Sequence, residues 1–144
     1  MKADAQTQAA VMATLDQFKQ AYERRDIERF LSVFAPDPDV VLLGTGADEK
    51  RVGLAEIRAQ AERDWSQSDA ASWEWGWSSI SAAGPMAWAA VDAVGQITVA
   101  GQDIRLPLRL TLVLEQRDGR WLWVQAHASI PAQEQAEGES FPTS

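Results

Sequence analysis

The sequence predicts an α+β fold in which a cone-shaped, curved antiparallel sheet wraps around helices. Residues 106–130 give the strongest signal, because two strand-length runs of alternating apolar residues flank Asp118-Gly119, a dipeptide that tolerates the positive φ of a tight hairpin turn. Helical segments precede the strands, and the apolar spacing changes from helical to alternating after Ser66. The expected order is two helices, a strand, a helix and four long strands (ααβαββββ).

The N-terminal half shows the spacing of helices that bury one face. Apolar residues recur at helical intervals within residues 5–24 and predict a first helix there: Val11, Leu15, Phe18 and Tyr22. Asp26 is a suitable N-cap for a second, short helix, which Pro36 ends. Residues 54–65 show the same spacing and predict a third helix.

The strands are expected to begin in the first half of the chain. A short strand is predicted at residues 40–43, followed by a loop over residues 44–53 that is rich in turn residues. After the third helix, Trp73, Trp75 and Trp77 alternate with polar or small residues and predict a strand with three indoles on one face. The next strand and the terminal hairpin complete the four long strands.

The chain of 144 residues is long enough for one domain with a buried core, and we expect no second domain. The domain is expected to cover residues 1–131. Residues 132–144 are polar and acidic with a single apolar anchor, Phe141, and are expected to form a loosely held tail. The N-terminus lacks an apolar signal segment and no apolar run is long enough to span a bilayer, which favours a cytoplasmic location.

The composition excludes several classes of function. A formal net charge of −8 argues against nucleic acid and against anionic membranes as partners. The absence of cysteine excludes disulfides and thiolate sites, and a single histidine excludes a multi-histidine metal site. We therefore expect neither a metal nor an organic cofactor.

Several segments, taken in order, resemble a known superfamily. They are FLSVFAPDPDVVLLG at residues 30–44, TGADEKRVG at residues 45–53, RDGRW at residues 117–121 and HASIP at residues 127–131. With the order of elements, they resemble the nuclear transport factor 2-like (NTF2-like) superfamily in its SnoaL-like branch, over nearly the whole chain. The resemblance implies a cystatin-like α+β barrel with a pocket between sheet and helices. Because the superfamily includes isomerases, cyclases, dehydratases, hydrolases and a kinase hub domain, it implies fold far better than function.

The residues that carry catalysis in several of these relatives are missing. Alignment with ketosteroid isomerase puts Phe18 at its tyrosine position and Leu42 near its base, so we expect that chemistry to be absent. Scytalone dehydratase needs two histidines, and this chain has only His127. The compared polyketide cyclases use an acid near the end of the sheet, where this chain has Gln125, His127 and Ser129.

His127 is the main candidate for proton transfer, because its ordinary pKa lies near neutrality. Strand alternation is expected to put it on one face with Trp121, Trp123, Gln125 and Ser129. Asp92 and Glu49 are the carboxylates that could act with it. Each of the three has an alternative interpretation. His127 could be a structural histidine at a dimer contact, and Asp92 could simply face solvent. Glu49 could brace its loop together with Thr45.

A ligand pocket is expected between the first helix and the sheet. Phe18, Tyr22 and Trp65 should line its helical side, and Trp75 and Trp88 its sheet side. Arg109 is a candidate for binding a ligand carboxylate, with an interfacial arginine as the alternative. The alternative for the tryptophans, seven in this chain, is ordinary packing in the core and at a dimer contact.

Two functions therefore remain open. In the first, the chain is a homodimer through its outer sheet face, and its cone binds a small apolar or carboxylated molecule without turnover. In the second, it is a cofactor-independent lyase, isomerase or hydrolase in which His127 acts with Asp92 or Glu49. The first is preferred because the relatives' acid and tyrosine positions are apolar here. The side-chain register of the last hairpin distinguishes the two.

Overall fold

The computed structural model describes residues 1–143 and contains three helices ahead of the long strands. They are α1 (Ala5–Arg24), α2 (Ile27–Leu31) and α3 (Leu54–Ser66). The Asp4 carboxylate caps α1 by accepting a hydrogen bond from the Thr7 backbone N–H at 2.7 Å. Asp26 caps α2 as predicted, since its carboxylate accepts from the Arg29 N–H at 3.1 Å.

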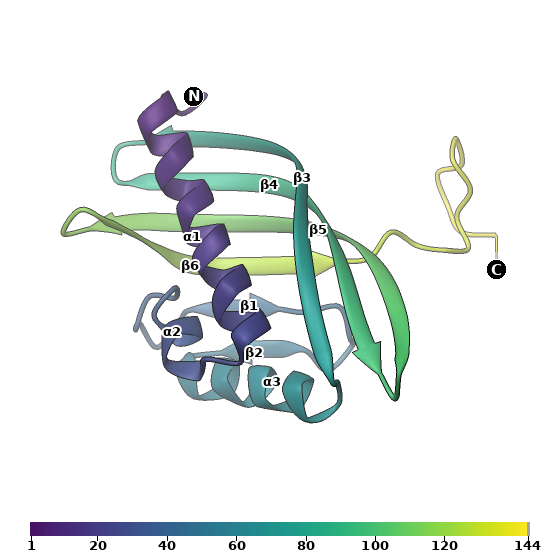
Figure 1. The fold of residues 1–144 in the computed structure, drawn as a ribbon. Helices are drawn as coiled ribbons and strands as arrows, with labels where there is room; N and C mark the ends of the chain where they lie inside the picture. The colour runs from purple at the N-terminus through teal and green to yellow at the C-terminus, as the bar shows by residue number, and fades with distance from the viewer. Residues whose placement is uncertain (144) are drawn as a thin grey trace.

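The strands form one six-stranded sheet in the order β2-β1-β6-β5-β4-β3. Their bounds are β1 (Val41–Leu43), β2 (Lys50–Val52), β3 (Ala70–Ala83), β4 (Met86–Val99), β5 (Gln102–Arg117) and β6 (Arg120–Ser129). The pairings are antiparallel except for β1 with β6, which is parallel. The α+β class is confirmed, and the sheet is curved but not closed into a barrel (Figure 1).

The sequence prediction missed β2, which lies within the loop expected over residues 44–53. Leu43 pairs with Lys50 and Val41 with Val52, so the chain turns back on itself between β1 and β2. Turn residues fill most of this segment and hide a strand of only three residues. The turn brings Glu49 against α3, where its carboxylate accepts a hydrogen bond from Gln60 at 2.7 Å.

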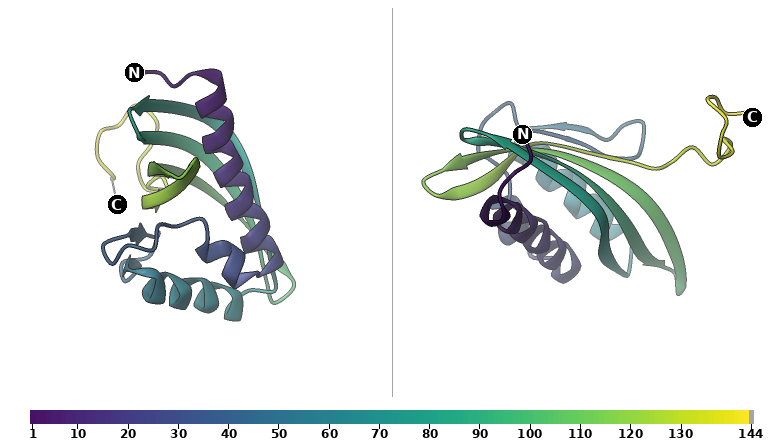
Figure 2. Two further views of the ribbon diagram at one scale, coloured as in Figure 1. Left: turned by 90° about the vertical axis from the view of Figure 1, so that its left-hand side faces the viewer. Right: turned by 90° about the horizontal axis from the view of Figure 1, so that it is seen from above.

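All three helices lie on the concave side of the sheet (Figure 2). α1 crosses the strands, and α3 lies beside the end of the cone near β1 and β2 (Figure 1). The buried core between helices and sheet includes α1 residues Val11 and Leu15, and the β5 residues Leu112 and Leu114. Burial of these apolar surfaces is the main driving force for the fold.

A β-bulge in the last hairpin changes which residues share a face. Val113 pairs with Gln125 but the next residue, Leu114, pairs with Trp123, so β6 contains one extra residue at this point. The shift turns Trp123 into the core, where it is 0% exposed, and leaves Gln125 and His127 on the outer face. The prediction that Trp123 and His127 share one face is therefore wrong.

A second irregularity lies in β3 between Trp75 and Ser78. Trp75 packs against the core, and its indole N–H donates to the Asp16 carboxylate at 3.2 Å. Trp77 is turned out and is 62% exposed. The expected row of three indoles on one face is thus interrupted at its third member.

The last residues lead away from the sheet (Figure 1). Residues 132–143 form short turns, such as the hydrogen bond from the Gln135 N–H to the Ala132 carbonyl at 3.3 Å. Residue 144, the end of the predicted tail, lies outside the described residues. None of the helices within residues 1–143 has the length and apolar character needed to cross a membrane.

Candidate functional site

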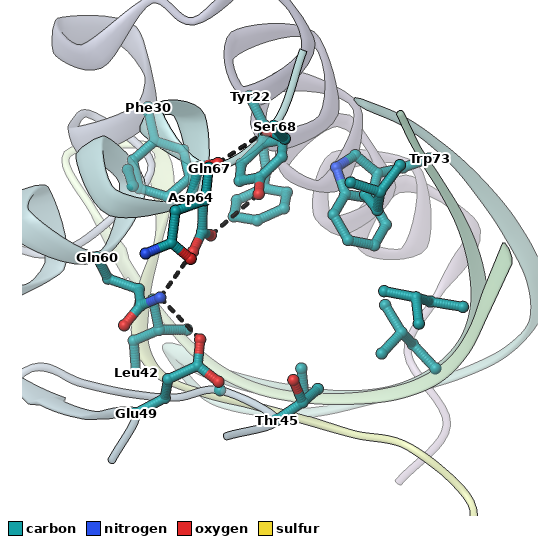
Figure 3. Close-up of a pocket in the computed structure, with 17 residues that line it drawn as sticks. Tyr22, Phe30, Leu42, Thr45, Glu49, Gln60, Asp64, Gln67, Ser68 and Trp73 are labelled. Atoms are coloured by element: carbon teal, nitrogen blue, oxygen red, sulfur yellow. Dashed lines mark hydrogen bonds between the residues drawn. The ribbon is translucent and has the colours of Figure 1, made fainter. Parts of the chain in front are cut away.

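A cavity of about 300 Å³ lies inside the cone, between α1, α3 and the inner face of the sheet (Figure 3). Its lining combines an apolar majority with a short polar stretch. The lining residues are Phe18, Tyr22, Phe30, Leu42, Gly44, Thr45, Glu49, Gln60, Ala61, Asp64, Gln67, Ser68, Trp73, Ile97, Leu106, Leu108 and Ala128. Its size is at the lower end of the range for small-molecule sites.

Aromatic rings form the apolar part of the wall near α1. The Phe18 ring stacks on Trp123 with centroids 4.9 Å apart and on Tyr22 at 6.0 Å. Tyr22 meets the Trp73 ring edge-on at 5.4 Å. Because each ring is held by its neighbours, the wall is rigid and flat, which suits a flat apolar ligand.

A chain of hydrogen bonds forms the polar part of the wall (Figure 3). The Tyr22 hydroxyl donates to Asp64 Oδ2 at 3.0 Å. The Gln60 amide donates to Asp64 Oδ1 and to Glu49 Oε1, both at 2.7 Å. The chain thus joins α1, α3 and the turn before β2, which are distant in sequence.

Two arginines support this chain from outside the cavity. Arg51 Nε donates to Gln60 Oε1 at 2.9 Å, which fixes the orientation of the amide. Arg63 lies 2.7 Å from Asp48 and 3.5 Å from Glu49. Glu49 also accepts a hydrogen bond from the backbone N–H of Gly46 within its own turn. The geometry of Glu49 is therefore that of a brace, although its side chain also faces the cavity.

Burial shifts the pKa values of Asp64 and Tyr22 upward. Desolvation raises the pKa of Asp64 above its ordinary value, and the hydrogen bonds from Gln60 and Tyr22 oppose that rise. Desolvation also raises the pKa of Tyr22, and the nearby Asp64 charge adds to the effect. Tyr22 therefore stays protonated and acts as a hydrogen-bond donor, while Asp64 holds its proton to a higher pH than an exposed aspartate.

Comparison with known proteins identifies the family of the chain. The family model described as SnoaL-like domain matches residues 11–133. The chain belongs to the SnoaL-like domain family. No curated protein matches the chain.

Solved structures share the fold of this SnoaL-like domain. A protein from Xanthomonas campestris, provisionally described as a calcium/calmodulin-dependent protein kinase II association domain, has a TM-score of 0.77 and 23% identity, covering 91% of this chain and 90% of that one. An NTF2-like protein of unknown function from Pseudomonas putida KT2440 has a TM-score of 0.76 and 18% identity, with 96% and 97% covered. A type 2 hexachlorocyclohexane dehydrochlorinase has a TM-score of 0.77 and 14% identity, with 86% and 84% covered.

Three residues of the predicted site line the cavity: Phe18, Tyr22 and Glu49. Trp65 lies one layer behind, with its ring 5.9 Å from Tyr22 and 6.0 Å from Phe30, so it supports the wall without lining it. Trp65 is set back from the cavity because the face of α3 that lines it carries Gln60, Ala61 and Asp64 instead.

Three other predicted ligand-binding residues do not line the cavity. Trp75 packs against the core away from it. Trp88 alternates with the buried Ala87 and Ala89, so it faces the outer side of β4. Arg109 pairs with Asp92 across β4 and β5, and both are exposed. The arginine expected to bind a ligand carboxylate is thus separated from the cavity by the sheet.

The proposed catalytic trio does not assemble in the SnoaL-like domain. His127 is exposed and pairs with Thr111 and Leu43 on the outer face, where Asp92 also lies, whereas Glu49 faces the cavity. The reason is strand alternation: Ala126 and Ala128 point inward, so His127 between them points outward. Among residues 1–143, no group of three histidine, aspartate or glutamate side chains is placed to hold a metal ion.

Sequence reasoning missed Gln60 and Asp64, the centre of the polar wall. They lie one helical turn apart on α3, next to the stripe that includes Ile57 and Ala61. The sequence signal that could have identified them is a pair of polar residues beside an apolar stripe. By helical spacing alone such a pair is predicted to face solvent. It is covered here because Glu49, 11 residues before Gln60 in the sequence, folds over the helix.

Proposed function

We propose that this SnoaL-like domain binds a small, largely apolar molecule in its cone and does so without turning it over. The observation that carries the proposal is the shape and chemistry of the cavity, which has rigid aromatic and aliphatic walls and one hydrogen-bonded polar wall. Apolar walls favour binding by removing ligand surface from water, and the polar wall orients the molecule.

The proposal is tested by filling the cavity. Ala128 lines it from β6 and is partly buried, so Ala128→Phe adds a ring to the space. We expect 2-naphthol to bind with one site per chain and to quench tryptophan fluorescence, since Trp73 is part of the wall. Ala128→Phe should weaken that binding about tenfold or more, which corresponds to about 1.4 kcal/mol.

The matched control is Gln96→Phe, which adds the same ring to an exposed position on the outer side of β4. Its affinity for 2-naphthol should equal that of the unmodified chain. Absence of saturable binding, or an equal loss in both variants, would contradict a cavity site.

A second candidate function is acid–base catalysis without a cofactor, with Asp64 as the proton carrier in place of His127 and Asp92. The observation in its favour is a cavity carboxyl whose pKa is raised by burial and which accepts a hydrogen bond from Tyr22 at 3.0 Å. A dehydrochlorinase shares this fold, so the fold is also found among enzymes.

This candidate is tested with 2-tetralone, a flat ketone with acidic C–H bonds, in deuterated water. Catalysis by Asp64 predicts exchange of those hydrogens above background, followed by NMR, and its loss in Asp64→Asn. Exchange that is no faster than in buffer, or that persists in the variant, would leave binding without turnover as the function.

We further propose that two copies associate through the outer sheet face, as a cytoplasmic homodimer. The centre of that face carries small or apolar side chains among a few polar ones: Leu43, Ala90, Thr111, Val113 and His127. The helices lie on the concave side, so none of the helices within residues 1–143 covers this face (Figure 2). His127 would then be a structural histidine at the dimer contact.

A further inference from the structure

The hydrogen-bond donors that surround Asp64 in the polar wall are already used. The Gln60 amide protons are committed to Glu49 and Asp64, and the Tyr22 hydroxyl proton is committed to Asp64. The Ser68 hydroxyl donates to the backbone carbonyl of Asp64 at 2.8 Å. An ionised carboxylate offers about four acceptor sites, and each Asp64 oxygen receives only one of these bonds. Asp64 therefore keeps free acceptor sites for a ligand that donates hydrogen bonds.

The same wall carries negative charge that is only partly compensated. Glu49 and Asp64 face the cavity, whereas no lysine or arginine is among the lining residues described for it. Arg63 lies behind the wall and pairs with Asp48 and Glu49. Within residues 1–143, Asp64 forms no ion pair of its own. Asp64 is therefore the lining carboxylate that has no ion-pair partner among the described residues.

The apolar walls suit a cation as well as a flat ring. Phe18, Tyr22, Phe30 and Trp73 all present aromatic surface to the cavity. Aromatic faces attract ammonium groups within about 6 Å of a ring centroid. The net charge of −8 adds a general attraction for cations.

We propose that the cavity selects flat apolar molecules that carry an amine and discriminates against their carboxylate analogues. This selectivity rests on the proposed binding function and narrows its ligand class. The ammonium group donates to the free acceptor sites of Asp64, and the ring packs against Phe18 and Trp73. A carboxylate in the same place meets Glu49 and Asp64 with no basic partner.

Isothermal titration with three probes that share a naphthalene ring tests the selectivity: 2-naphthylmethylamine, 2-naphthol and 2-naphthoate, at pH 7 and low salt. We expect the amine to bind at least tenfold more tightly than the naphthoate. Asp64→Asn should weaken amine binding about tenfold, because it removes the charge while keeping the size of the side chain. The control is Asp92→Asn, which removes an exposed carboxylate from the outer face and should leave amine binding unchanged.

The outcomes separate this inference from the function on which it rests. If none of the probes binds, the binding function itself fails. If 2-naphthol binds but the naphthoate binds as tightly as the amine, or Asp64→Asn leaves amine binding unchanged, the selectivity is wrong and the binding function stands. If Asp64→Asn does not fold, carboxyl NMR of the unmodified chain decides: the bound amine should lower the pKa of Asp64, and an unchanged pKa would overturn the inference.

Discussion

At the scale of single residues, Gln60 connects the elements around the cavity. Its side chain is 4% exposed, and its amide is hydrogen-bonded to Glu49, Asp64 and Arg51 at once. Glutamine suits this place because one end donates twice and the other accepts.

Gln60→Leu should lower the free energy of unfolding by about 1–3 kcal/mol, because it leaves buried polar partners without their hydrogen bonds. Urea denaturation followed by circular dichroism measures the change. Gln96→Leu is the control at an exposed position and should stay within about 0.5 kcal/mol. Equal effects in the two variants would show that the network contributes nothing to stability.

Asp64 should make stability fall as the pH rises. Its pKa in the folded chain is raised above the ordinary value of 3.8, so the folded state binds the proton more tightly than the unfolded state. The stabilisation by the bound proton is complete below pH 3.8, and it is lost as the pH rises through the raised pKa of Asp64. Asp64→Asn should remove this part of the pH dependence in urea denaturations between pH 3 and 7. An identical pH profile in both proteins would contradict the shift.

Some of the cavity residues could be predicted from the sequence, and others could not. Phe18 and Tyr22 follow from the apolar stripe of α1, which fixes the face that meets the sheet. Gln60 and Asp64 are neighbours on α3, but Glu49 meets Gln60 only because the turn before β2 folds over that helix. Such a contact depends on tertiary packing, for which a single sequence offers no periodic signal.

At the scale of elements, the terminal hairpin follows its sequence closely in the turn and departs from it in the strand. Asp118 and Gly119 have φ values of 50° and 78°, as a tight hairpin turn requires. Strand alternation then fails at the bulge near Val124, where β6 gains one residue relative to β5. A pattern of period two does not reveal the bulge, because the inward-facing positions change there from Trp121 and Trp123 to Ala126 and Ala128.

Gly119→Ala should destabilise the chain by about 1 kcal/mol, since an added Cβ meets no atom within 4 Å and the cost is that of the positive φ alone. Asp118→Asn is the matched substitution in the same turn and should be nearly neutral, because asparagine tolerates the left-handed region. Thermal unfolding compares the two variants. A neutral Gly119→Ala would mean that the turn relaxes to another type.

At the scale of the whole molecule, the fold separates two surfaces with different expected roles. The cavity lies on the concave side of the sheet, and the helices leave the convex side uncovered (Figure 2). The α+β class was predictable because long alternating strands and amphipathic helices each leave a clear period in the sequence. Which face each tryptophan occupies was not, because two bulges reset the alternation.

Association through the convex face predicts a mass near twice 15.8 kDa in light scattering at micromolar concentration. Thr111→Glu places a charge at the centre of that face, on an exposed position next to His127, and should shift the mass toward that of one chain. Trp123 is unsuitable for this test because it is fully buried. A single-chain mass for the unmodified protein would refute the dimer without affecting the cavity.

The most direct test of the account is a titration of the 15N-labelled chain with 2-naphthol, observed at the indole N–H signals of its seven tryptophans. Trp73 lines the cavity, whereas Trp77 and Trp88 lie outside it. Binding in the cone predicts a saturable shift of the Trp73 signal while those of Trp77 and Trp88 remain in place. Shifts confined to Trp77 or Trp88, or no shift at any tryptophan, would contradict the proposed site.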